Sequence, residues 1–410
     1  MCTWGAVETV GYFLRNGSEV FSCLMDMTKA FDNVKYSVLF SKLIRANVSS
    51  IFIRVLFFIY VQQFANIRCD GIFSNIFPIR NGVRQGAFCS GILYCFYCND
   101  LFEELRRSGY GCWINGTYCG IWGYSDDNFL LAPSEASLQE MINICERYAA
   151  SHNLQFSTDQ RPGKCKTKCL AYLKKPRHLE PRLLCGNPLP WVTQGLHLGH
   201  HISNKYNGMK LDAKCKRAQY ISKNCELNQE FSFAHPDTKF KVNSIYNSHM
   251  TGSVLWNLFS KEVNMIENSW NVSFRCMYNL PLQTHRYMVE PISNQTHIQS
   301  LLYQRFIGFI DRLEKSDKTS ITTIFRAVIH DTNSTTGFNL RNILLKTNRF
   351  RKEDLSPSLF KSLSYQPIPE SEEWRIEMIR DIIKYRYELA SIECLSYSEI
   401  QEILNYVCII

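Results

Sequence analysis

Three carboxylates in the first third of the chain have the types and positions that phosphate chemistry needs. Asp26 ends a short apolar run, and Asp126 and Asp127 stand between two further apolar runs. Like charges at close range repel, so converging carboxylates favour a bound cation, and Mg²⁺ prefers carboxylate oxygens. Two Mg²⁺ ions, or two Mn²⁺ ions, would activate an attacking hydroxyl and stabilise the leaving oxygen of an in-line phosphoryl transfer. The alternative for Asp126 and Asp127 is purely local, because paired aspartates also favour tight turns.

The apolar spacing around these carboxylates predicts an α+β fold. Strands are predicted over residues 21–26, 121–124, 129–132 and 168–173, and helices over residues 90–107 and from the capping residue Ser134. The order is therefore β-α-β-β-α-β, in which both helices cover one face of an antiparallel sheet. This arrangement would bring the three carboxylates to one edge of the sheet.

The remaining segments predict a helical insertion and a helical second half. Residues 35–44 and 51–61 have helical spacing, and Asp70-Gly71 marks a tight turn between two strand-like runs. After residue 205 the pattern is mostly helical, including an amphipathic stretch over residues 372–389 and a capping signal at Ser396 and Glu399. Boundaries are expected near residues 205 and 300, which gives regions 1–205, 206–300 and 301–410.

The positive charge of the chain is concentrated in one segment. The 410 residues carry 46 Lys and Arg against 37 Asp and Glu, a formal charge of +9. Residues 161–241 alone hold 16 Lys and Arg against 5 Asp and Glu, a net charge of +11. This concentration of positive charge favours the binding of a polyanionic partner at that segment. The hydrophobic content of 45% excludes a disordered or collagen-like chain.

Cysteine usage and the N-terminal sequence indicate an intracellular protein. The 17 Cys are scattered through the chain, and the opening residues lack the basic and apolar regions of a signal peptide. The most apolar stretch, residues 51–61, contains Arg54 and is too short to cross a bilayer, so no membrane segment is expected.

The cysteines and histidines do not predict a zinc site. Cys95 and Cys98 have the spacing of a metal-binding pair, but no second pair follows at zinc spacing. Cys165, Cys169 and residues 197–201 form no convincing ligand set, so core thiols are expected.

Three segments, in this order, resemble motifs A, B and C of reverse transcriptases, most closely those of non-LTR (LINE-type) retrotransposons. They are Asp26-Met-Thr-Lys-Ala-Phe31-Asp32, then Asn81-Gly-Val-Arg84-Gln85-Gly86 with Ser90, then Gly123-Tyr124-Ser125-Asp126-Asp127. The resemblance implies a right-hand polymerase palm in which Asp26, Asp126 and Asp127 hold the metal ions. It also implies template-directed addition of dNTPs to a primer 3′-hydroxyl, with an RNA template and a DNA primer as partners.

The same resemblance gives roles to neighbouring residues. Phe31 matches the aromatic steric gate, which would clash with a ribose 2′-hydroxyl, although a core Phe fits the same pattern. Gln85 and Gly86 match the pair that meets the incoming nucleotide, and Arg84 beside them would contact phosphate or template unless it is an ordinary surface arginine. Tyr124 would pack beneath the primer terminus.

Two further segments resemble motifs D and E. Residues 156–159 leading to residues 166–172 look like motif D, in which Lys166 would donate a proton to the leaving pyrophosphate; Lys164 and Lys168 are close alternatives. The run from Trp191 contains Leu196, His197, Leu198 and Gly199, which match the primer grip. The basic segment 161–241 would then contact the template-primer through phosphate and sugar.

The resemblance covers about residues 5–205, with partial fingers, and residues 206–300 are only loosely similar to a thumb. Only 25 residues precede Asp26, so the chain looks truncated at its N-terminus and short of a complete fingers region. Gly91 stands where Pro is common, and Ser125 where Ala is common. The rival interpretations are a catalytically inactive nucleic-acid-binding relic and a polymerase of ribonucleotides, against which Phe31 argues. No stable protein partner is expected.

Overall fold

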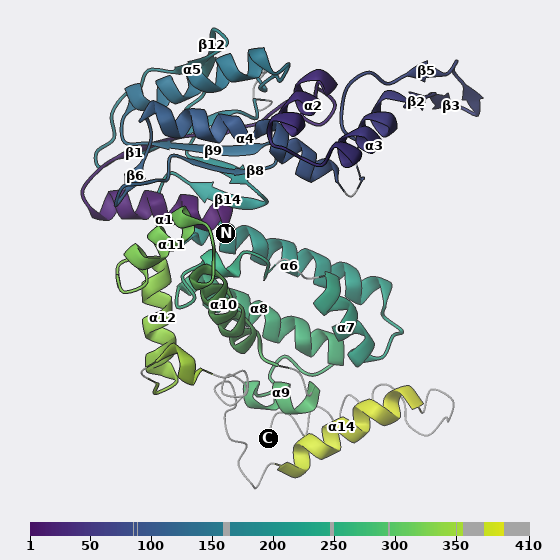
Figure 1. Ribbon diagram of the computed structural model, residues 1–410. Helices are drawn as coiled ribbons and strands as arrows, with labels where there is room; N and C mark the ends of the chain where they lie inside the picture. The colour runs from purple at the N-terminus through teal and green to yellow at the C-terminus, as the bar shows by residue number, and fades with distance from the viewer. Residues whose placement is uncertain are drawn as a thin grey trace. The chain divides into compact units, whose positions relative to one another are not determined.

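The protein is described here by a computed structural model that divides into two compact units (Figure 1). The structure describes residues 1–84, 86–87, 89–158, 165–246, 250–293, 296–349, 351–355 and 373–388. Unit 1 comprises Met1–Tyr206 with Lys318–Ile324, and unit 2 comprises Asn207–Asp317 with Phe325–Ile410. Within the described residues, no helix is both long and apolar enough to cross a membrane. The capping signal at Ser396 and Glu399 lies outside the described residues.

Unit 1 is built on a four-stranded antiparallel sheet. Its strands are β1 (Val20–Met25), β8 (Ile121–Tyr124), β9 (Asp127–Ala132) and β10 (Lys168–Tyr172), in the spatial order β10-β1-β9-β8. All six residues of β1 are buried, as expected for a central strand covered on both faces. The register pairs Cys23 with Cys169 on one side and with Leu130 on the other. The four strands that the apolar spacing predicts are therefore present, with ends that differ by at most two residues.

Two helices, α4 (Ser90–Ser108) and α5 (Glu135–Ser151), cover one face of this sheet (Figure 1). Gly109 ends α4 with φ at 77°, a left-handed conformation that favours glycine. Ser134 begins α5, because its side chain accepts a hydrogen bond from the backbone N–H of Ser137. Along the chain these elements follow the order β1, α4, β8, β9, α5, β10.

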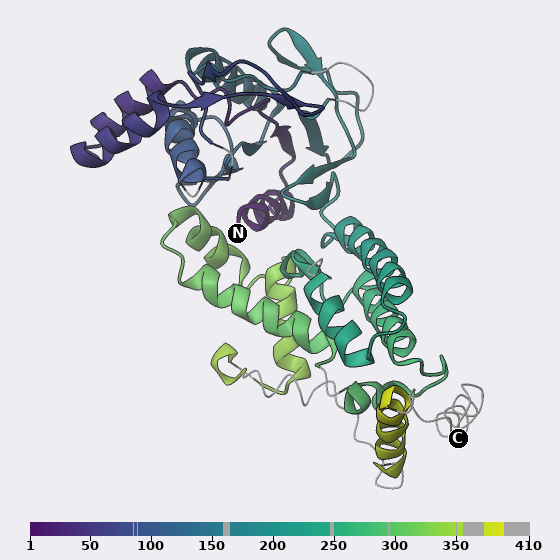
Figure 2. The same cartoon turned by 90° about the vertical axis from the view of Figure 1, so that its right-hand side faces the viewer.

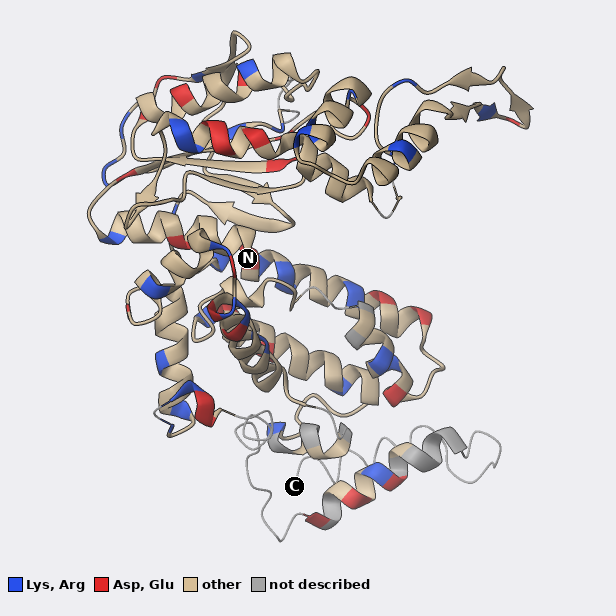
Figure 3. Ribbon diagram, viewed as in Figure 1, with Lys and Arg blue, Asp and Glu red and all other residues tan. Residues whose placement is uncertain are grey.

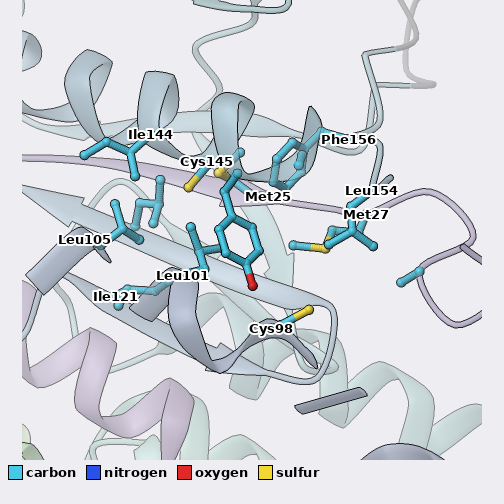
Figure 4. Packing of buried hydrophobic residues seen from close by; sticks show 14 of the residues in the cluster. Met25, Met27, Cys98, Leu101, Leu105, Ile121, Ile144, Cys145, Leu154 and Phe156 are labelled. Carbon is cyan, nitrogen blue, oxygen red and sulfur yellow. The ribbon is translucent and has the colours of Figure 1, made fainter. Parts of the chain in front are cut away.

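The core between the helices and the sheet is closely packed (Figure 4). Leu101 and Leu105 of α4 and Ile144 and Cys145 of α5 face the sheet, where they meet Met25 of β1. These side chains are all nearly or fully buried. Their burial is the main source of stability for this layer, since a fully buried aliphatic side chain contributes about 1.5–3 kcal/mol.

A helix that the sequence did not predict, α1 (Cys2–Arg15), covers the opposite face of the sheet (Figure 1). Its buried side includes Trp4, Ala6 and Val10. Gly5 lies directly on the indole ring of Trp122 in β8, where a Cβ atom would come within 2.3 Å of ring carbon. Glycine is therefore needed for close approach of the helix to the sheet, although it lowers helix propensity.

The insertion between β1 and α4 contains two helices and a long hairpin. Its elements are α2 (Tyr36–Arg45), α3 (Ser50–Val61), β2 (Phe64–Ala65), β3 (Arg68–Cys69), β4 (Ile72–Phe73) and β5 (Phe77–Pro78). Asp70 and Gly71 form the expected tight turn, both with positive φ. Only Leu56 and Tyr60 of α3 are buried, and its other apolar side chains are mostly exposed. Figure 3 shows few charged residues on α3 and on the strands β2 to β5.

Short hairpins complete unit 1. They are β6 (Trp113–Ile114) with β7 (Thr117–Tyr118), β11 (Arg182–Leu184) with β12 (Asn187–Leu189), and β13 (Gln194–His197) with β14 (His200–Ser203).

Unit 2 is helical in its described residues. Its elements are α6 (Lys210–Glu230), α7 (Pro236–Tyr246), η2 (Ser253–Leu255), α8 (Lys261–Tyr278), α9 (Arg286–Ser293), α10 (Ile298–Glu314), α12 (Thr335–Lys346), η3 (Lys352–Asp354) and α14 (Glu373–Glu388), while α11 (Thr319–Val328) begins in unit 1. Helices α6 and α8 lie side by side in both views (Figures 1 and 2), and Arg217 Nε donates to Ser269 Oγ across their contact at 2.8 Å. The indole N–H of Trp256 donates to the buried carboxylate of Asp212 at 2.8 Å.

One glycine-to-alanine pair tests how α1 is seated. Gly5→Ala should lower the free energy of unfolding by about 1–3 kcal/mol, because the new methyl group overlaps the ring of Trp122. Gly91→Ala in α4 is the matched control: apart from its chain neighbours and the backbone of its own helix, no described atom lies within 4 Å of the position of the new methyl group. Helix propensity should therefore raise stability by up to about 1 kcal/mol. Urea unfolding measures both. Equal effects of the two substitutions would contradict the packing of α1 on β8.

Candidate active site

Asp26 is the first residue after β1, and its backbone is held from two sides. Its N–H donates to Thr167 Oγ1 at 3.4 Å, and its carbonyl accepts a hydrogen bond from the N–H of Ser157 at 2.9 Å. The carboxylate is partly exposed. Asp26 therefore lies at the carboxyl end of the central strand, at the end of the sheet where the sequence predicted it.

The hairpin between β8 and β9 is tighter than the sequence predicted. Tyr124 pairs with Asp127, so only Ser125 and Asp126 form the turn, and Asp127 already belongs to β9. Ser125 has φ at 59°, in the left-handed region that such a two-residue turn requires. The predicted strands 121–124 and 129–132 leave both aspartates between the strands, and this is wrong for Asp127: Asp126 lies in the turn, and Asp127 lies on the strand beside β1.

A cavity of about 350 Å³ in unit 1 joins residues from four separate parts of the chain. Its lining consists of Leu24, Met25, Asp26, Asp127, Asn128, Lys166, Lys168, Leu196, His197, Leu198 and Gly199. The segments that resemble motifs A, C, D and E thus meet around one space. The sequence did not single out Leu24, Met25 or Asn128, which have no chemical signal of their own and are identified only by their position.

Charge is unbalanced in this cavity. Burial raises the pKa of Asp26, and the Asp126 carboxylate nearby raises it further, while Lys166 acts in the opposite direction. Burial also raises the pKa of Asp127, and the neighbouring carboxylates Asp126 and Asp26 add to this effect. Lys166 Nζ lies 3.6 Å from Asp26 Oδ2, but its side chain is 71% exposed, so water screens much of the attraction.

The donor chemistry of the cavity fits a divalent cation of the Mg²⁺ type. Asp26 and Asp127 supply hard carboxylate oxygens, and their repulsion is only partly offset by Lys166. Asp126 is near enough to influence both pKa values but does not line the cavity. Among the residues that the structure describes, no three His, Cys, Asp or Glu side chains are grouped as metal ligands. The metal-binding triad of Asp26, Asp126 and Asp127 therefore stays a prediction.

The residues expected to meet the nucleotide lie around α4 and the end of β1. The ring of Phe31 stacks on Tyr94, with centroids 4.8 Å apart. Arg84 Nε donates to Gln63 Oε1 at 3.2 Å, and Gly86 has φ at 85°, which favours glycine. The side chain of Tyr124 is 69% exposed. Gln85 and Lys164 lie outside the described residues.

The segment expected to form the primer grip is the hairpin of β13 and β14, with its turn at Leu198 and Gly199. Leu196 is 60% exposed, whereas His197 is only 3% exposed. His197 Nδ1 lies 3.1 Å from Thr3 Oγ1 of α1, and its ring packs on Phe129 of β9. His197 therefore anchors the hairpin to the sheet and to α1, and Leu196 remains accessible.

The thiols of α4 differ in accessibility. Cys98 is buried, which raises its pKa to about 11, whereas Cys95 is exposed. A buried thiol of this kind packs as a small apolar group.

Residues 6–202 match the reverse transcriptase (RNA-dependent DNA polymerase) family. This part of the chain is similar to a reverse transcriptase domain, and the mixed α and β fold of unit 1 agrees with a polymerase fold.

Over 216 residues the chain is 24% identical to the RNA-directed DNA polymerase from mobile element jockey of Drosophila melanogaster. This match confirms the LINE-type resemblance that the motifs indicate. The alignment covers 51% of this chain and 21% of the relative, so the chain spans about a fifth of the length of that protein.

Among solved structures, the telomerase of Candida albicans, in complex with a TWJ fragment of telomeric RNA, matches with a TM-score of 0.39 and 11% identity. The match covers 90% of this chain and 53% of the telomerase chain. So loose a similarity supports no conclusion about the site.

Removing one carboxylate should stabilise the protein in the absence of divalent cations. The pKa values of Asp26 and Asp127 are raised in the folded state, so their contribution to stability is lost as pH rises through those values. At pH 7 and low salt, Asp127→Asn should therefore raise the free energy of unfolding, by about 1 kcal/mol. Urea unfolding in EDTA measures this, with Asp70→Asn on the exposed β3–β4 turn as the control. A loss of stability in Asp127→Asn would show that the carboxylates do not repel.

Acid should weaken the anchoring of the primer-grip hairpin. Burial, with a smaller effect from His200, lowers the pKa of His197 to about 4. Its stabilising effect is complete above the ordinary histidine pKa near 6.5 and is lost as pH falls toward 4, by roughly 3 kcal/mol in total. Urea unfolding between pH 7 and pH 4 should show this loss, and His197→Gln should reduce the pH dependence.

His178 provides the control for that measurement, because its side chain is exposed. His178→Gln should leave the acid dependence unchanged. An equal change in both variants would mean that the burial of His197 is not the cause.

Proposed function

We propose that this chain is an RNA-directed DNA polymerase, which adds dNTPs to a primer 3′-hydroxyl under the direction of an RNA template. The observation that carries the proposal is the cavity in which Asp26, Asp127, Lys166 and the Leu196–Gly199 turn meet. These residues are far apart in the sequence, and each belongs to a segment that resembles a different reverse transcriptase motif.

The proposed architecture assigns a part of such a polymerase to each region. The four-stranded sheet with α4 and α5 is the palm, and the insertion with α2 and α3 forms part of the fingers. Residues 206–300 are thumb-like, and residues 301–410 form a helical C-terminal region.

Asp26, Asp126 and Asp127 are proposed to hold two Mg²⁺ ions, with Mn²⁺ as a substitute. Bound there, these ions would activate the primer hydroxyl and stabilise the leaving oxygen. In the described structure only Asp26 and Asp127 share the cavity, so Asp126 would have to turn toward it when a cation binds. Relief of the repulsion between the carboxylates would favour that change.

Other side chains of the cavity have proposed roles that need no metal. Lys166 is long, exposed and placed beside Asp26, so it can follow the leaving pyrophosphate and give it a proton. Phe31 would exclude a ribose 2′-hydroxyl, with Gln85, Gly86 and Arg84 around the same nucleotide.

The primer would lie against the turn of β13 and β14. There Leu196, Leu198 and Gly199 offer a contact surface, and Tyr124 would pack beneath the primer terminus. His197 would hold the turn in place from below.

The basic segment supports a nucleic-acid partner. Lys166 and Lys168 of unit 1 belong to this segment, and so does α6 of unit 2, which shows several basic residues along its length in Figure 3. A template-primer of A-like form exposes phosphate and sugar, so we propose contacts of this kind and a steep loss of affinity with salt.

One observation favours the relic as a second candidate function. The described residues contain no assembled group of three metal ligands. A chain that binds the template-primer through its basic segment without extending it would agree with this observation.

Primer extension distinguishes the two functions. The full chain with an RNA template, an annealed DNA primer, dNTPs and Mg²⁺ should extend the primer. Asp26→Asn and Asp127→Asn should each reduce the rate by at least about 10³-fold, because the carboxylates would act on the transition state. Asp70→Asn should retain the rate of the unsubstituted chain.

Binding of the same template-primer at 50 mM and 200 mM salt completes the test. Binding that is salt-sensitive but gives no extension would favour the relic. If the unsubstituted chain neither binds the template-primer nor extends the primer, both functions are contradicted.

A further inference from the structure

Tyr94 and Phe31 form a stacked pair at the junction between α4 and the loop after β1. Their ring centroids are 4.8 Å apart, and their planes differ by 19°. Tyr94 is fully buried, whereas Phe31 is only partly buried. One face of Phe31 is thus supported from inside the protein, and the ring is not enclosed on every side.

Tyr94 is itself held by the segment that bears Asp26. Its hydroxyl donates to Met27 Sδ at 3.0 Å, and Met27 directly follows Asp26. Burial, with smaller effects from Cys98 and Asp126, raises the pKa of Tyr94, so the hydroxyl keeps its proton. Tyr94 therefore connects the loop of Phe31 to the end of β1.

The backbone of Phe31 is fixed independently of its ring. Its carbonyl accepts a hydrogen bond from the N–H of Val83 at 2.8 Å, and the N–H of Gly82 donates to the carbonyl of Val34 at 2.9 Å. Gly82 has φ at 92°, and a Cβ atom there would lie 3.0 Å from the Asp32 backbone. With the peptide fixed, the direction of the Phe31 ring depends on side-chain torsions, and the face of Tyr94 limits them.

We propose that Tyr94 is a positioning residue for sugar selection, holding the Phe31 ring where a ribose 2′-hydroxyl would collide with it. The inference rests on the proposed polymerase function and on Phe31 as its gate. Tyr94 is too deeply buried to touch a nucleotide, so it acts only through Phe31. The interaction energy of one aromatic pair is large enough that its loss should change the selectivity for dNTP over rNTP measurably.

The ratio of kcat/KM for a dNTP to that for the matching rNTP measures this role. Tyr94→Leu removes the ring and should lower the ratio roughly threefold to tenfold, the size expected for one aromatic pair. Tyr94→Phe keeps the ring and loses only the hydroxyl, so it should retain the ratio of the unsubstituted chain. Phe31→Ala should lower the ratio further than Tyr94→Leu.

Tyr97 provides the matched control. It lies in the same helix and is also fully buried, but its ring packs edge-on against His152. Its hydroxyl donates to the carbonyl of His152 and accepts a hydrogen bond from the N–H of Lys35 at 3.5 Å. Tyr97→Leu should disturb α4 to a similar extent but leave the dNTP to rNTP ratio unchanged. In the background of Phe31→Ala, Tyr94→Leu should have no further effect on the ratio.

The outcomes separate this inference from the proposed function. If the unsubstituted chain extends no primer, both fail. If it extends primers and Tyr94→Leu leaves the ratio unchanged, or Tyr97→Leu lowers it equally, the inference alone is overturned. If Tyr94→Leu does not fold, Tyr94→Met, which fills the space without a ring, should lower the ratio; an unchanged ratio in that variant overturns the inference.

Discussion

The antiparallel register of β1 and β9 is the constraint on which the rest of the site depends. It pairs Met25 with Asn128, so the end of one strand meets the start of the other and sets Asp26 beside Asp127. Helices on both faces bury the sheet, and burial is the largest cause of the raised pKa of each carboxylate. The packing that stabilises the sheet thus produces a repulsion that a bound cation relieves most effectively.

Local signals made most of this fold predictable. The apolar periodicity of β1, α4 and α5 agrees with their burial, and Gly109 and Ser134 mark helix ends by backbone geometry and hydrogen bonding. Helix α1 has such a signal only at its C-terminus, where Asn16 and Gly17, with φ at 77°, follow Arg15. Gly5 and Gly11 lower its helix propensity, and their purpose is visible only in three dimensions, where they make room for the rings of Trp122 and Tyr206. A glycine that is needed for a tertiary contact weakens the helix signal of the sequence around it, so α1 could not be predicted from local residues.

The sequence predicted that the motif segments converge, and residues from four of those segments line one cavity. The direction of individual side chains could not be predicted in the same way. Successive residues of a strand point to opposite faces, which buries His197 and exposes Leu196 of β13. The β8–β9 turn has two residues, whereas the predicted strands left four between them, so Asp126 lies in the turn and Asp127 on β9. Such a difference depends on turn geometry, here the left-handed Ser125, which the sequence does not mark with a glycine.

The distribution of charge around the site limits what can neutralise a triphosphate there. Between residues 50 and 78 the insertion carries only Arg54, Arg68 and Asp70, and much of its surface is apolar. This stretch therefore offers little positive charge to phosphate. Lys166 and Lys168 line the cavity itself, and Arg84 is engaged with Gln63. If the chain binds a nucleotide without further residues, the lysines and the proposed cations must supply most of the compensating charge, so binding should depend on divalent cations more strongly than on the arginines of the insertion.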